Sequence, residues 1–143
     1  MRNEAAKEAF LCADDEWCEA MPGVKQAVIL AGGRGTRLAP LTDTLPKPLI
    51  EVGGRPFIDH LLTMVRQEGI TRVVMLLGYR AQMIIDHLGD GARFGLEISH
   101  SVTPEEDDTG QRLRQAVEIL DREFLMMYCD NYWPMSLARL WRS

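Results

Sequence analysis

Cysteine is scarce in this sequence, and its positions favour neither a disulfide framework nor a zinc site. The 143 residues include only Cys12, Cys18 and Cys129. This odd number contains no CxxC pair and no Cys/His spacing suited to zinc. We therefore predict reduced thiols, as in a cytoplasmic protein.

Long apolar runs and basic runs are also missing. No stretch approaches the roughly 20 apolar residues that a membrane span requires, and the acidic N-terminus lacks the apolar segment of a signal peptide. The formal net charge is -5, with no run of Lys and Arg to bind nucleic acid by bulk electrostatics. We expect a soluble protein with neither a membrane nor a nucleic acid as partner.

The first 22 residues differ in character from the remainder. They are acidic and permissive for helix, and Pro22-Gly23 ends them with a turn signal. We interpret residues 1–22 as an N-terminal extension and residues 23–143 as one domain.

Strand and helix patterns alternate along this domain. Continuous or alternating apolar runs predict strands at residues 26–31, 72–79, 94–101 and 123–128. Apolar residues at helical spacing predict helices over 57–65, 80–88 and 112–121. In the last helix, Leu113, Ala116, Val117 and Leu120 form the expected apolar stripe, and Arg112, Arg114, Glu118 and Asp121 the opposite, polar face.

Such alternation predicts the α/β class: a three-layer, Rossmann-like fold with a mostly parallel sheet and helices on both faces. Ligands bind such sheets at the carboxyl ends of their strands. The first predicted strand ends at "AGGRGTR" and the fourth at "CDN". Both segments are therefore expected at the ligand-binding edge.

The stretch "LAGGRGTRLAPLTDTLPKPL", residues 30–49, has the composition of a polyphosphate site. Its glycines let backbone N–H groups approach phosphate oxygens, and Arg34 and Arg37 can add charged hydrogen bonds. Lys47, whose backbone is restricted by the prolines on either side, can place a further positive charge beside the same anion. The stretch is not a P-loop, and Leu38 stands where a Rossmann fingerprint requires glycine. The alternative is a tight turn with solvated arginines.

The residues "LAGGRGTRLAPLTDTLPKPLIEVGGRPFIDHLL" resemble the signature of the sugar-1-phosphate nucleotidylyltransferases. The likeness continues through "GYRAQMIIDHLGDGARFGLEISHS" to "MMYCDN". Members of that family transfer a nucleoside monophosphate from a nucleoside triphosphate to a sugar 1-phosphate and release pyrophosphate. Their catalytic domain is longer, so the resemblance implies that this chain is an N-terminal, truncated portion of the fold.

The resemblance also implies roles for individual residues. Arg37 and Lys47 would be catalytic, acting on the phosphates, and Asp130 would bind Mg²⁺. Asp86 would accept hydrogen bonds from a guanine base, and the backbone of Gly91 would lie against the base. The full set of implied nucleotide-binding residues is Ala31, Gly32, Gly33, Arg34, Gly35, Thr36, Asp86 and Gly91.

One segment departs from the family pattern. Where many members have L-G-T-G-G-A, Thr109 and Gly110 agree, while Asp107, Asp108, Gln111 and Arg112 do not. The identity of the sugar therefore stays open. Two other functions stay open as well: a nucleotide-binding or regulatory module that does not catalyse, and a transferase acting on an alcohol phosphate. Assembly as a homo-oligomer also stays open.

Overall fold

The computed structural model describes residues 24–132, 134 and 136. The expected extension, residues 1–22, and the final segment that follows Asn131-Tyr132 lie wholly or largely outside the described residues. So do Cys12 and Cys18. No helix in the described part of the chain is long and apolar enough to cross a membrane.

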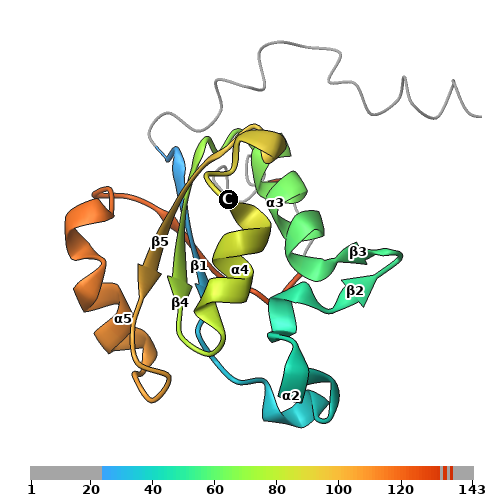
Figure 1. Ribbon diagram of the computed structural model, residues 1–143. Helices are drawn as coiled ribbons and strands as arrows, with labels where there is room; N and C mark the ends of the chain where they lie inside the picture. Colours follow the sequence, from blue (N-terminus) through green and yellow to red (C-terminus); the bar gives the residue numbers. More distant parts are fainter. Residues whose placement is uncertain (1–23, 133, 135, 137–143) are drawn as a thin grey trace, which may run out of the picture.

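A four-stranded parallel sheet forms the centre of the molecule (Figure 1). Its strands are β1 (Gln26–Ala31), β4 (Arg72–Leu77), β5 (Glu97–Val102) and β6 (Leu125–Tyr128), in the order β5-β4-β1-β6. All six residues of β1 are buried. The uninterrupted apolar run predicted for residues 26–31 is thus a central strand covered on both faces.

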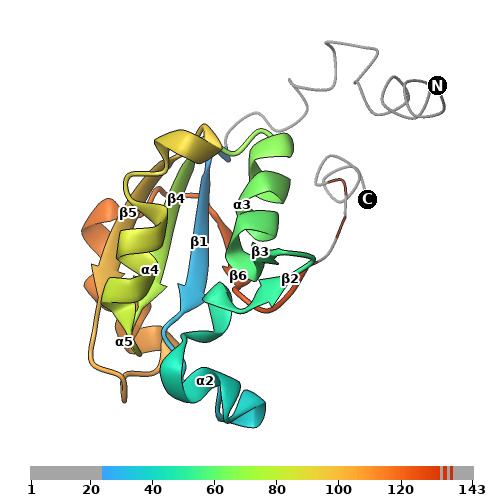
Figure 2. The ribbon, with the colours of Figure 1, turned by 45° about the vertical axis from the view of Figure 1, so that its right-hand side comes forward.

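Helices lie on both faces of this sheet, as Figures 1 and 2 show. On one face, α3 (Phe57–Gln67) and α4 (Ala81–Leu88) pack against Ala27, Ile29 and Ala31 of β1. On the other face, α5 (Thr109–Gln115) and the residues after it pack against Val28 and Leu30. The predicted three-layer α/β fold is confirmed.

Residues 32–56 form an excursion from the carboxyl end of β1 before α3 begins. It contains η2 (Thr36–Leu38), α2 (Leu41–Thr44), η3 (Lys47–Leu49) and a short antiparallel hairpin of β2 (Glu51–Val52) and β3 (Arg55–Pro56). Two further short turns, η4 (Ala92–Phe94) and η5 (Val117–Ile119), precede β5 and follow α5. Because η4 occupies Phe94, β5 begins at Glu97, three residues later than predicted.

The predicted helix over residues 112–121 is wrong in extent and in part of its pattern. The helix α5 starts earlier, at Thr109, and ends at Gln115; the chain then turns into η5. This change of geometry breaks the apolar stripe: Ala116 is buried, but Val117 is 62% exposed. Arg112, expected on the polar face, is only 4% exposed, because its guanidinium reaches carbonyl oxygens at the strand ends.

The exposure of Val117 can be tested against a buried valine on the same side of the sheet. Val28→Ala should lower the free energy of unfolding by about 2 kcal/mol, since it removes buried methyl groups and leaves a cavity. Val117→Ala makes the same chemical change at an exposed site and should cost less than about 0.5 kcal/mol. Urea unfolding measures both. Equal losses would contradict the packing described for α5 and η5.

Candidate functional site

A cavity of about 390 Å³ lies at the carboxyl ends of the strands. Residues from four separate segments line it: residues 30–35 at the end of β1, Lys47 in η3, residues 105–112 after β5 and residues 128–130 at the end of β6. Parallel pairing brings the ends of these three strands to one edge. The lining residues are Leu30, Gly32, Gly33, Gly35, Lys47, Glu105, Asp107, Asp108, Thr109, Arg112, Tyr128, Cys129 and Asp130. The two segments expected at this edge from the sequence therefore meet here.

The glycine-rich loop presents unpaired backbone donors to this cavity. Within the described residues, the N–H groups of Gly33, Arg34 and Gly35 donate to no acceptor. Gly35 has a φ of 67°, in the left-handed region that favours glycine, and Thr42 Oγ1 donates to its carbonyl oxygen over 3.0 Å. Free N–H groups held in a fixed turn are suited to an anion.

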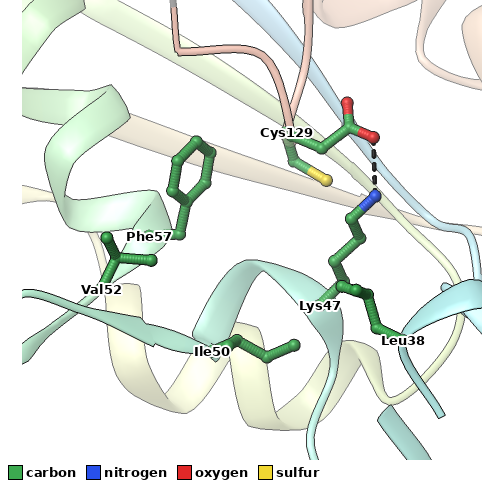
Figure 3. A pocket seen from close by; sticks show the side chains of 7 residues that line it. Leu38, Lys47, Ile50, Val52, Phe57 and Cys129 are labelled. Carbon is green, nitrogen blue, oxygen red and sulfur yellow. Dashed lines mark hydrogen bonds and ion pairs between the residues drawn. The ribbon is translucent and has the colours of Figure 1, made fainter. Parts of the chain in front are cut away.

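Lys47 and Asp130 come together although 83 residues separate them in the sequence. Lys47 Nζ donates to Asp130 Oδ2 over 2.7 Å (Figure 3). Lys47 is fixed by η3, and Asp130 follows the end of β6, which pairs with β1. The structure thus places at one point the two groups for which the sequence suggested phosphate and metal contacts.

The Lys47–Asp130 pair also borders a second, more apolar cavity of about 150 Å³. Its other walls are Leu38, Ile50, Val52, Phe57 and Cys129, as Figure 3 shows. The pair therefore borders both the larger cavity, whose lining includes several charged side chains, and the more apolar cavity beside the β2–β3 hairpin.

The two loop arginines are placed differently. Arg34 lies 3.8 Å from Glu105 and its guanidinium carbon is 5.1 Å from the centre of the Tyr79 ring. Arg37, in η2, is exposed and makes no ion pair or side-chain hydrogen bond within the part of the chain that the structure describes. Neither arginine lines the cavity, and of the two only Arg37 has a guanidinium without a partner in the described residues.

Four further expected residues do not line the cavity. Ala31 ends β1 and is buried, and Thr36 starts η2 at the exposed rim. Asp86 accepts a hydrogen bond from Gln82 on the exposed side of α4.

The fourth, Gly91, lies at the amino end of β5, where a side chain would strike Ile98. Because α4 runs antiparallel to the strands, its carboxyl end and the turn after it point away from the cavity. The structure therefore brings neither Asp86 nor Gly91 to the loop.

Sequence reasoning missed the acidic wall of the cavity. Glu105, Asp107 and Asp108 follow β5 directly, and Asp108 caps α5 by accepting from the Gln111 N–H over 2.8 Å. The signal was available, because this "PEEDD" segment follows a predicted strand and its place at the carboxyl edge follows from the topology. Tyr128 and Cys129, at the end of β6, could have been placed by the same argument.

The donor set suits a magnesium ion that shares its coordination with a ligand. Asp130 Oδ1 has no partner within the described residues, whereas Oδ2 receives Lys47. Those residues contain no cluster of three or more His, Cys, Asp or Glu side chains able to hold an ion alone. One carboxylate completed by water and phosphate oxygens is a common arrangement for Mg²⁺.

Comparison with known proteins identifies the family. The sequence profile of the family described as "Nucleotidyl transferase" matches residues 26–141. The chain belongs to this family. Among its relatives, the N-acetylmuramate alpha-1-phosphate uridylyltransferase of Neisseria meningitidis is 42% identical over 107 residues. This match covers 73% of the chain and 46% of the relative.

Two other relatives extend this comparison. The UTP–glucose-1-phosphate uridylyltransferase of Haloferax volcanii is 35% identical over 113 residues, which cover 79% of the chain and 46% of the relative. The crystal structure of HddC from Yersinia pseudotuberculosis, complexed with GMP-PN, matches with a TM-score of 0.71 and 25% identity over 83% of the chain and 53% of that protein. The chain thus spans about half the length of these relatives.

The cysteine beside this site should be chemically inert at neutral pH. Burial, followed by the neighbouring Asp130 carboxylate, raises the pKa of the Cys129 thiol to about 11, so the thiolate fraction at pH 7.5 is very small. We expect iodoacetamide to alkylate Cys129 about two orders of magnitude more slowly in the folded protein than in urea. Peptide mapping by mass spectrometry measures this. Equal rates in both conditions would contradict the burial of the thiol.

Proposed function

We propose that the cavity binds a nucleoside triphosphate and that the protein transfers the nucleoside monophosphate to a sugar 1-phosphate, with release of pyrophosphate. One observation carries this proposal. In a chain of the nucleotidyl transferase family, Gly33 and Gly35, whose N–H groups have no acceptor within the described residues, line one cavity at the carboxyl edge of the sheet together with Lys47 and Asp130.

Transfer at phosphorus requires positioning and charge stabilisation more than covalent chemistry from the protein. An oxygen of the sugar phosphate attacks the α-phosphorus in line. The bond between the α-phosphorus and the oxygen that bridges it to the β-phosphorus breaks, and pyrophosphate leaves with the electron pair of that bond. The loop amides would hold the phosphates, and Arg37 would stabilise charge on the leaving group. Lys47 would bind phosphate oxygens from the side of β6.

Magnesium dependence is part of this proposal, with Asp130 as the protein ligand. When bound, Mg²⁺ neutralises phosphate charge and orients the oxygens to which it binds. Asp130 holds Lys47 through one carboxylate oxygen and leaves the other for the ion. The pair thus keeps a cation and a metal ligand within 2.7 Å of each other before substrate arrives.

The names of the relatives support the class of substrate. Two are uridylyltransferases of sugar 1-phosphates, and the third was solved with the nucleotide analogue GMP-PN. Because Asp86 lies away from the cavity, the geometry gives no preference for guanine through that residue. We place the protein in the cytoplasm, the compartment that keeps a thiol such as that of Cys129 reduced.

A binding and turnover series tests the proposal. Isothermal titration with UTP, GTP, ATP, CTP and dTTP in the presence of MgCl₂ should show saturable binding of at least one triphosphate. Pyrophosphate release should then appear with one member of a panel of sugar 1-phosphates. Binding without release for any sugar would favour the non-catalytic nucleotide-binding module, and release with alcohol phosphates alone would favour the related transferase. No binding of any triphosphate would overturn the proposal.

Arg37→Ala should separate catalysis from binding. Loss of one donor to the developing charge costs about 3 to 4 kcal/mol of transition-state stabilisation, or roughly 100- to 1,000-fold in rate. Pyrophosphate release should fall by that amount, while the melting temperature stays within 1 or 2 °C because Arg37 is exposed, by analogy with other surface substitutions. A pure binding protein would instead show only weaker affinity for the triphosphate.

Gly33→Ala tests whether the phosphates approach the loop backbone. Gly33 is exposed, and a Cβ there would meet no atom of the described protein within 4 Å. The substitution should therefore change stability by less than about 0.5 kcal/mol yet weaken triphosphate binding tenfold or more, about 1.4 kcal/mol. Titration and thermal melting measure the two effects. Unchanged affinity in a stable variant would place the phosphates elsewhere.

A further inference from the structure

Arg112 is the most deeply buried cationic side chain among the described residues, and it lies beneath the glycine-rich loop. It is 4% exposed and lines the cavity at the carboxyl ends of the strands. Its Nη1 donates to Leu77 O over 2.8 Å and to Thr103 Oγ1. Its Nη2 donates to Glu105 O over 3.0 Å and, more weakly, to Gly32 O over 3.4 Å.

These four acceptors come from three different parts of the chain. Gly32 follows β1, Leu77 ends β4, and Thr103 and Glu105 belong to the turn after β5. The guanidinium therefore joins the ends of three neighbouring strands through hydrogen bonds that use all four protons of Nη1 and Nη2. The Nε–H has no acceptor within the described residues.

Two glycines make room for this guanidinium. A methyl group on Gly32 would lie less than 3.0 Å from the guanidinium carbon of Arg112, and one on Gly78 less than 3.0 Å from both of its Nη atoms. Neither glycine has a positive φ. Gly32 is thus required by the close approach of Arg112, and not by its own backbone conformation.

In the described part of the chain, Arg112 forms no direct ion pair, although Glu105, Asp107 and Asp108 line the same cavity. None of the ion pairs formed within residues 24–132 includes it; all of its acceptors are neutral. A buried cation without a directly paired carboxylate is costly to the fold. Such a violation of the usual pairing is expected where a site awaits an anionic ligand.

We propose that Arg112 is a positioning residue for the triphosphate. Its guanidinium fixes the turn after β5 relative to Gly32, the first glycine of the loop, and this sets the direction of the loop N–H groups. Its positive charge also strengthens binding of the phosphates. This inference rests on the proposed function, because it assumes that the loop binds phosphate.

Variants of Arg112 with a matched control test the proposal. Arg112→Met removes both the positive charge and the guanidinium hydrogen bonds, whereas Arg112→Lys keeps the charge but lacks the guanidinium. Arg114→Met makes the same change in charge on the exposed side of α5. Titration of each variant with inorganic pyrophosphate and with the triphosphate that the unmodified chain binds most tightly, at several salt concentrations, gives the affinity and its salt dependence.

We expect Arg112→Met to weaken binding of both ligands tenfold or more and to make it less dependent on salt, because one cation no longer contributes. Arg112→Lys should lie between Arg112→Met and the unmodified chain, and Arg114→Met should change affinity less than twofold. A folded Arg112→Met variant with unchanged affinity and salt dependence would overturn the proposal. If the unmodified chain binds no triphosphate, the proposed function has failed, which is a distinct result.

A double-mutant cycle keeps the proposal testable if Arg112→Met does not fold. Gly32→Ala displaces the guanidinium without removing it and should lower both the melting temperature and the affinity for pyrophosphate. In the Arg112→Lys background, which keeps the charge but lacks the guanidinium, the same methyl group has room, so the loss of melting temperature from Gly32→Ala should largely vanish. Equal losses in both backgrounds would overturn the close approach on which the inference depends.

Discussion

The parallel pairing of β1 with β4 on one side and β6 on the other is the constraint on which the site depends. Backbone bonds continue this pairing past the strand ends: Tyr79 N donates to Gly32 O, and Cys129 N donates to Leu30 O, each over 3.0 Å. The loop after β1 therefore leaves the sheet directly beside Asp130. Because β1 is buried on both faces, a shift in its register would move its side chains out of the positions in which they pack against the helices, so this placement is strongly held.

The electrostatics of the site are local and not a property of the whole chain, whose net charge is -5. Lys47 is paired with Asp130 and Arg34 with Glu105, so neither cation stands alone. The Arg34–Glu105 contact is long and exposed, and such pairs contribute at most about 1 kcal/mol. Phosphate oxygens can therefore replace the carboxylate at little cost. Within the described residues, Arg37, Arg80 and Arg112 form no ion pair with a carboxylate, and of these three only Arg112 lines the cavity.

The sequence predicted those features that depend on local patterns. Apolar runs located the strands, and topology then brought the glycine loop and Asp130 to one edge, where the structure has them. Features that depend on tertiary contacts were missed. Arg112 looks like a surface residue in a helical wheel, because nothing in its neighbours reveals the carbonyls of Leu77 and Glu105. Asp86 was assigned by resemblance alone, and the direction of α4 carries it away from the cavity.

Each of the three loop glycines lacks a side chain for a different physical reason, although they form one motif in the sequence. Gly35 needs its left-handed backbone, with φ at 67°, and packs closely on Lys47 and Thr42. Gly32 lacks a side chain because a guanidinium occupies that space. Gly33 satisfies neither condition, since no atom of the described protein lies near its missing side chain. No contact within the described protein therefore accounts for glycine at this position. Under the proposed function, a phosphate bound at the free N–H group of Gly33 would approach the backbone closely, and a side chain there would hinder that approach.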